Sequence, residues 1–154
     1  MESCKKMLDT TTLPFTLRDS ACEPPAVVLD LAVLMSLPGV SKRRDAPVLK
    51  HLLGIFVGEM SRSVGLLQAA LEHGDREQVG RLAHRMKSSA LAMGALHLGT
   101  AARRLDGSLK AGAPLDPADG GIIAAAWRDA RQALLDEGLL GADELRSIEA
   151  SIGS

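Results

Sequence analysis

Aromatic residues are scarce in this 154-residue chain, which has one Trp, two Phe and no Tyr. Aromatic side chains form the platforms on which single-stranded nucleic acids stack and the cages that hold methylated lysine. Positive charge is not in excess either, because 18 Lys and Arg stand against 19 Asp and Glu, for a formal net charge of −1. A protein that binds nucleic acid mainly through phosphates should be distinctly basic. The composition therefore argues against nucleic-acid binding.

Cysteines are also rare, and the two that occur, Cys4 and Cys22, lie near the N-terminus without a C-x-x-C pair. We therefore expect no zinc site and no redox motif, and the histidine spacing predicts no metal site either. No uncharged apolar run reaches about 18 residues, and the N-terminus lacks the apolar region of a secretory signal. These absences predict a cytoplasmic protein that spans no membrane.

The core must be built from Leu, Ala, Val, Ile and Met, and a chain rich in Ala and Leu favours helix over sheet. Apolar residues recur at helical spacing in four stretches, which end or begin at glycine, proline or aspartate: about residues 47–73, 76–93, 95–111 and 117–138. No stretch alternates convincingly with period two. The sequence therefore predicts an all-α protein, an up-down-up-down four-helix bundle joined by short loops.

Both ends of the chain extend beyond these four helices. Residues 1–25, with a Thr run and Pro24-Pro25, are predicted to be a flexible tail. Residues 26–37 are apolar nearly all round and predict a short helix that caps one end of the bundle. We expect the bundle domain over residues 26–138. Residues 139–154 would be a C-terminal extension that can form a short helix at 142–152.

Capping residues in the sequence predict where three of the helices start. Asp45 is positioned to cap the helix that begins near Pro47, Asp75 with Gln78 fits a capping box, and Asp116-Pro117 puts a proline at the first helical position.

The helix expected at 47–73 carries a stripe of small residues. Each glycine inside a helix lowers its stability by up to about 1 kcal/mol, so the stripe needs a structural reason. We expect another helix to pack closely on this stripe: Gly54, Gly58, Ser61 and Gly65.

The helix expected at 76–93 has an unusual outer face. At about 100° per residue, its apolar residues centre almost opposite His84, so His84 should point at solvent. Gly80 and Ser88 lie one turn before and after it, Lys87 follows three residues on, and Leu91 adds an exposed apolar side chain. The pattern predicts an accessible imidazole with room for another protein to approach.

An imidazole in this position can act as a nucleophile, because its unperturbed pKa of about 6.5 leaves it largely neutral near neutral pH. A convex helix without a cleft suits a phosphoryl acceptor better than a general base, since a partner can supply the pocket. Lys87, at i+3, can reach back to neutralise phosphoryl oxygens.

The run from Ala83 to Leu96, AHRMKSSALAMGAL, resembles the motif of histidine-containing phosphotransfer (HPt) domains. That pattern is Ala-His, any residue, an apolar residue, Lys-Gly-Ser, and Gly-Ala a few residues later. The resemblance implies that His84 is the phosphorylated histidine, Lys87 the supporting lysine and Gly94 the glycine that ends the helix. It covers about residues 26–112 and extends to 137. Ser88 departs from the family's glycine but stays small, and its hydroxyl could bond a phosphoryl oxygen.

The resemblance also implies a function. His84 would take a phosphoryl group from the aspartate of one response-regulator receiver domain and pass it to another, in a relay that starts at a hybrid sensor histidine kinase. Mg²⁺ would belong to the receiver, and the chain would be a monomeric carrier without an ATP site of its own. The receiver would dock on the face formed by Gly80, Arg81, Ser88 and Leu91.

Three alternatives compete with this interpretation. A helical adaptor could bind receivers or kinases without being phosphorylated. The dimerising domain of a sensor kinase would need an ATP-binding domain and usually has an acidic residue after the histidine, where this chain has Arg85. A small helical enzyme using His84 as a base lacks a visible cleft partner. The sequence is compatible with both a free-standing protein and a fragment of a hybrid kinase.

Overall fold

The computed structural model of the chain describes residues 28–152. Within that range the regular structure is helical throughout: α3 (Leu31–Met35), α4 (Pro47–Glu72), α5 (Arg76–Ala92), α6 (Leu96–Lys110), α7 (Ala118–Asp136) and α8 (Ala142–Ile152). The prediction of an all-α protein is confirmed. The predicted tail at 1–25, with Cys4 and Cys22, lies outside the described residues.

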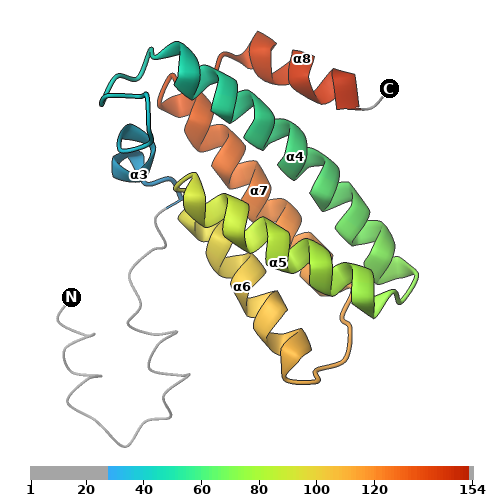
Figure 1. The fold of residues 1–154 in the computed structure, drawn as a ribbon. Coiled ribbons are helices and arrows are strands. Elements are labelled where there is room, and N and C mark those ends of the chain that lie inside the picture. Colours follow the sequence, from blue (N-terminus) through green and yellow to red (C-terminus); the bar gives the residue numbers. More distant parts are fainter. Residues whose placement is uncertain (1–27, 153–154) are drawn as a thin grey trace, which may run out of the picture.

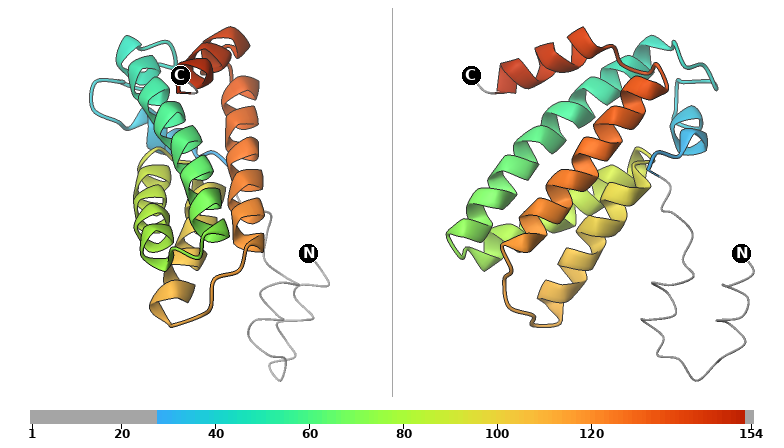
Figure 2. Two further views of the ribbon diagram at one scale, coloured as in Figure 1. Left: turned by 90° about the vertical axis from the view of Figure 1, so that its right-hand side faces the viewer. Right: turned by 180° about the vertical axis from the view of Figure 1, so that it is seen from behind.

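Helices α4 to α7 form the bundle, and each runs antiparallel to the next along the chain (Figure 1). Helix α4 packs against α5 and α7, and α6 packs against the same two helices, so the four close into a ring. The two rotated views show this arrangement from the side and from behind (Figure 2). The up-down-up-down topology expected from the short connections is therefore correct.

The bundle core is aliphatic with one aromatic pair. Phe56 of α4 and Trp127 of α7 meet edge to face, with ring centroids 5.7 Å apart and an interplanar angle of 83°. Edge-to-face contacts of this kind add about 0.5–1.5 kcal/mol to the burial of the rings. The side chains around them are fully buried, among them Leu53, Met60, Leu67, Met86, Leu98 and Leu134. This core fixes the rotation of α5 about its own axis, and with it the direction of His84.

The capping predictions had mixed outcomes. Asp75 caps α5, because its carboxylate accepts a hydrogen bond of 3.2 Å from the backbone N–H of Gln78. Asp45 does not cap α4: the N-cap is Ala46, without a side-chain bond, and Asp45 pairs with Arg43 at 3.3 Å instead. The prediction for Asp45 was wrong because a basic neighbour two residues away competes for the carboxylate. Pro117 is the N-cap of α7, one residue before the expected position.

Helix α3 closes one end of the bundle, as expected, but it has only five residues. It starts at Leu31, because the Asp30 carboxylate accepts from the N–H of Ala32 and sets the N-cap there. Residues 26 and 27 of the predicted helix lie outside the described residues. The backbone N–H of Asp30 donates to the carbonyl of Gly94 at 2.7 Å, which ties α3 to the turn between α5 and α6.

Helix α8 explains half of the small-residue stripe on α4. A Cβ atom at Gly54 would lie 3.8 Å from Ile148 of α8, and one at Gly58 would lie 3.7 Å from the same side chain. Larger residues here would push α8 away. Nothing lies within 4 Å of such an atom at Gly65, so that part of the stripe has no packing role in this structure. An ion pair of 2.7 Å between Arg131 and Glu149 also ties α8 to α7.

None of the helices within residues 28–152 combines the length and the apolar character needed to cross a bilayer.

Candidate functional site: an exposed histidine above a buried aspartate

His84 lies midway along α5 on the side away from the core. The buried residues of α5 form the opposite stripe: Val79, Leu82, Ala83, Met86 and Ala90. The imidazole side chain is 59% exposed, so a reacting partner can reach it. The solvent-facing position predicted from the helical periodicity is therefore correct.

A buried carboxylate on α6 faces the imidazole. Oδ2 of Asp106 lies 3.6 Å from Nδ1 of His84, although the Asp106 side chain is only 7% exposed. The same oxygen accepts hydrogen bonds of 3.0 Å from Nζ of Lys87 and of 3.0 Å from Nζ of Lys110. A single oxygen of Asp106 thus lies close to three basic side chains. His84 and Lys87 come from α5, and Lys110 comes from α6.

The two lysines keep Asp106 ionised. Burial alone would raise the pKa of this carboxyl, but the hydrogen bonds and positive charges of Lys110 and Lys87 outweigh burial and lower the pKa from 3.8 to about 2. Asp106 therefore presents a full negative charge to His84 at neutral pH.

Because the pKa of Asp106 is lowered, we expect the protein to lose stability in acid. A carboxyl whose folded pKa lies below its unfolded pKa stabilises the fold above pH 4, and this contribution is lost as the pH falls towards 2. The contribution is on the order of 2 kcal/mol. In a carbon-detected NMR titration, the Asp106 carboxyl should keep its ionised chemical shift at pH 3. A titration midpoint near 3.8 would show that the lysines do not hold it.

Lys87 already has a partner, which the sequence did not reveal. Its side chain is 22% exposed and its ammonium group is bound to Asp106. The sequence led us to expect an ammonium group free to reach a phosphoryl group. In the structure this ammonium group is hydrogen-bonded to the Asp106 carboxylate, which also faces the His84 imidazole.

An open groove runs beside His84 between α5 and α6. Gly80, Arg81 and His84 line it from α5, and Asp106, Leu109 and Lys110 line it from α6. The expectation of a convex surface without a cleft was wrong, because Gly80 carries no side chain to fill the space next to Leu109. The groove lets the edge of another protein approach the imidazole.

The remaining predicted docking residues differ in how they are placed. Arg81 is exposed and pairs with Glu77 at 2.6 Å. Ser88 is exposed, but its hydroxyl donates to the backbone carbonyl of His84 at 3.2 Å, which occupies its proton. Leu91 is half-buried and not exposed as expected, because it packs over the backbone of Gly99 on α6. A Cβ atom at Gly99 would lie 2.5 Å from the Leu91 side chain.

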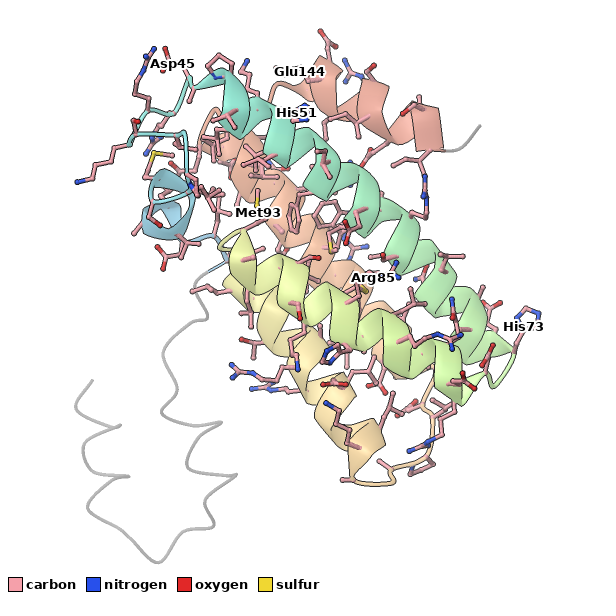
Figure 3. All side chains as sticks on the ribbon, viewed as in Figure 1. Asp45, His51, His73, Arg85, Met93 and Glu144 are labelled. Atoms are coloured by element: carbon pink, nitrogen blue, oxygen red, sulfur yellow. The ribbon has the colours of Figure 1, made fainter. Side chains whose placement is uncertain are left out.

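The other histidines lie away from this groove. His51 and His73 occupy opposite ends of α4 (Figure 3). Nδ1 of His97 lies 3.6 Å from a carboxylate oxygen of Asp129 on α7. Arg85, in contrast, also lines this groove, although it projects about 100° further around α5 than His84; Figure 3 shows it midway along that helix.

Asp106 and Lys110 are the site residues that sequence reasoning missed. A signal was present, because Asp106 follows Ala102 by four residues and Leu98 by eight, on the flank of the apolar stripe of α6. An acidic residue in that position is buried only if a cation pairs with it. Lys110, at i+4, supplies one such cation.

Comparison with known proteins identifies the family. Residues 51–137, more than half of the chain, match the Hpt domain family. The chain therefore belongs to the Hpt domain family, whose role is histidine phosphotransfer in two-component signalling through receiver domains and histidine kinases. The resemblance seen in the Ala83–Leu96 motif is confirmed.

The chain is also similar to a curated protein, the sensor histidine kinase AruS of Pseudomonas aeruginosa, with 30% identity over 119 residues. That alignment covers 76% of this chain and 12% of the relative, so the chain corresponds to a small part of a much longer protein. No solved structure matches the chain.

Proposed function

We propose that His84 accepts a phosphoryl group from the aspartate of one receiver domain and passes it to the aspartate of another. One observation carries this proposal: the exposed imidazole of His84 faces a buried, ionised carboxylate that holds two ammonium groups beside it. A hybrid sensor histidine kinase is the expected source of the phosphoryl group, and the chain acts as a monomeric carrier without an ATP site.

The position of Asp106 favours one tautomer of the imidazole. A carboxylate near Nδ1 stabilises the proton on that nitrogen, which leaves the lone pair on Nε2, the ring nitrogen further from Asp106. Nε2 then attacks the phosphorus atom of the receiver's acyl phosphate. The N–P bond forms, the P–O bond to the aspartate breaks, and the receiver recovers its carboxylate.

The transfer changes the charge on the imidazole ring. Nδ1 keeps its proton while Nε2 gains the phosphoryl group, so the ring becomes a cation that bears a phosphoryl dianion. The negative charge of Asp106 stabilises the ring cation, and the two lysines stabilise the dianion. Mg²⁺ belongs to the receiver's aspartyl phosphate site, and this chain supplies only the nitrogen and the charges around it.

A phosphotransfer assay tests the proposal. A panel of receiver domains is phosphorylated with a labelled acyl phosphate, freed of reagent and mixed with the chain. At least one receiver should pass its label to the chain within minutes, in a bond that is labile in acid and stable in alkali. Receivers that bind the chain but never pass on their label would favour the helical adaptor instead.

The small side chain at position 88 leads to a prediction about docking. Ser88→Trp should weaken binding of a receiver at least tenfold, because an indole one turn from His84 blocks the approaching surface. Ser108→Trp makes the same change at an exposed position of α6, about 200° around that helix from Asp106, and it should leave the affinity unchanged. Calorimetric titration and circular dichroism of both variants check this. Equal affinities of the two variants would remove residue 88 from the docking face.

A further inference from the structure

We propose that a groove between α4 and α8 binds an acidic amphipathic helix of a partner protein other than the receiver. Helix α4 supplies most of its lining, and α8 and α5 border it on opposite sides (Figure 1). We call it the α4–α8 groove, and its apolar and basic side chains include Lys50, Ile55, Arg62, Leu66, Arg85 and Ile148. Because α8 lies outside residues 51–137, the segment that matches the family does not form this groove by itself.

Two large apolar side chains of α4 are exposed in this groove. Ile55 is 53% exposed and Leu66 is 45% exposed. They are separated by about three helical turns, or about 16 Å along α4. With Arg62 they lie within about 40° of one another around the helix axis, so the carbon stem of the arginine continues the apolar strip. A strip of this length matches the apolar face of a short helix, whose anchors recur at three- and four-residue spacing.

The groove is also locally basic, although the whole chain has a formal net charge of −1. Three Lys and Arg residues line it, against one acidic residue. That acidic residue, Glu59, already accepts a hydrogen bond of 3.0 Å from the Ser89 hydroxyl. Among residues 28–152, neither Arg62 nor Arg85 has a hydrogen-bond or ion-pair partner. Carboxylates of a partner would pair with both guanidinium groups, because arginine and carboxylate form short, bidentate hydrogen bonds.

Helix α8 already shows which kind of helix the surface of α4 binds. It has Asp143 and Glu144 in its first turn, and its apolar residues recur at helical spacing: Leu145, Ile148 and Ile152. Ile148 lies over the glycines of α4, and Glu144 pairs with Lys50 at 3.6 Å. A second helix of this kind, placed beside α8, would set its apolar residues on the exposed strip of α4 and its acidic residues against the two unpaired arginines.

The shape of the site favours a helix over a membrane surface. The exposed strip lies in a groove bordered by α5 and α8, which a helix can enter and a flat bilayer cannot follow. Binding to anionic vesicles is therefore not expected.

Helix α5 separates the α4–α8 groove from the groove beside His84. None of the four residues predicted to dock the receiver lines the α4–α8 groove, and only Arg85 lines both grooves. The chain can therefore bind a receiver at His84 and a partner helix on α4 at the same time. Such a partner would raise the local concentration of any receiver attached to it.

Selection from a peptide library tests the proposal without assuming the identity of the partner. A phage-displayed library of random peptides, each about 16 residues long, is selected on the full chain, and the enriched peptides are synthesised and titrated by fluorescence anisotropy. They should carry acidic residues and leucine or isoleucine at helical spacing, and become helical on binding. Their affinity should fall at least tenfold for Arg62→Glu, because the reversed charge repels their carboxylates. It should fall about fivefold for Ile55→Ser, which removes apolar contact area.

Helix α7 provides the matched controls. Arg128 is an exposed arginine and Ile122 is a 58% exposed isoleucine, and neither lines the α4–α8 groove. Arg128→Glu and Ile122→Ser should bind the peptides as the unsubstituted chain does. Circular dichroism of all four variants should show the same helix content, since each substitution changes an exposed side chain.

Every other outcome overturns the proposal. A selection that enriches no acidic helical peptide, or peptides that bind the groove variants and the control variants equally, would remove the site. Enriched peptides that displace a bound receiver would assign the groove to the receiver's docking face. Vesicles of phosphatidylglycerol that bind the chain but not Ile55→Ser would assign it to a membrane. None of these results bears on the labelling of His84, so the proposed function is tested separately.

Discussion

The His84→Gln variant is expected to lose phosphoryl uptake from a receiver by at least a hundredfold, to the background of the assay. The glutamine amide has a similar polarity but no nucleophilic ring nitrogen, so the N–P bond cannot form. The fold should persist, because the side chain at position 84 is 59% exposed and surface substitutions usually change stability by less than about 0.5 kcal/mol. Labelling kinetics and urea unfolding of the same preparation measure both quantities.

The other histidines provide the controls for this variant. His51→Gln and His73→Gln change residues near opposite ends of α4, and His97→Gln changes a residue beside Asp129. Each of these variants should accept label at the rate of the unsubstituted chain. Label retained by His84→Gln, or lost on replacing one of the other three, would place the acceptor elsewhere.

The Gly94→Ala variant is expected to lose about 3 kcal/mol of unfolding free energy. Gly94 has a φ of +77°, and a Cβ atom there would lie 2.6 Å from the backbone oxygen of Asp30. A left-handed backbone costs about 1–2 kcal/mol for a residue other than glycine. The close approach adds to this cost, because a backbone atom cannot move aside as a flexible side chain can. The contact between α3 and the α5–α6 turn should therefore open.

Gly112→Ala separates the two contributions at Gly94. Gly112 follows α6 with a φ of +88°, but nothing lies within 4 Å of a Cβ atom at this position. It should cost only the strain of the left-handed backbone, about 1–2 kcal/mol. Urea unfolding of both variants gives the difference. Equal losses would mean that the approach of Asp30 to Gly94 contributes nothing to stability.

Features encoded locally could be predicted from the sequence. The stripe opposite His84 and the Asp75 cap each depend on residues within one helix, and both are found in the structure. The family motif around His84 is local in the same sense, and the match over residues 51–137 agrees with it. Periodicity fixes which side of α5 faces the core, and therefore which side faces a partner.

Features that depend on a second element could not be predicted in the same way. Asp106 meets His84 only because α5 and α6 pack with one particular register, which periodicity within either helix does not contain. The half-burial of Leu91 depends on Gly99 across the same interface. Asp45 was assigned to the wrong partner because capping rules consider only the helix and not the competing Arg43.

Helices α3 and α8 lie outside the segment that matches the Hpt family, and both pack on it at defined places. Helix α3 contacts the turn at Gly94, and α8 covers Gly54 and Gly58 on α4. The groove beside His84 contains no residue of either helix. These additions therefore leave the approach to the imidazole open.

The central claim is that the imidazole nitrogen of His84 further from Asp106 carries the phosphoryl group. A ¹H–³¹P correlation spectrum of the chain, phosphorylated by a receiver and with the His84 ring signals assigned, tests it most directly. The account predicts one phosphorus signal, coupled to both carbon-bound ring protons of His84, as an Nε2–phosphoryl bond requires. A phosphorus signal coupled to only one ring proton of His84, as an Nδ1–phosphoryl bond would give, or one coupled to another histidine, would contradict it.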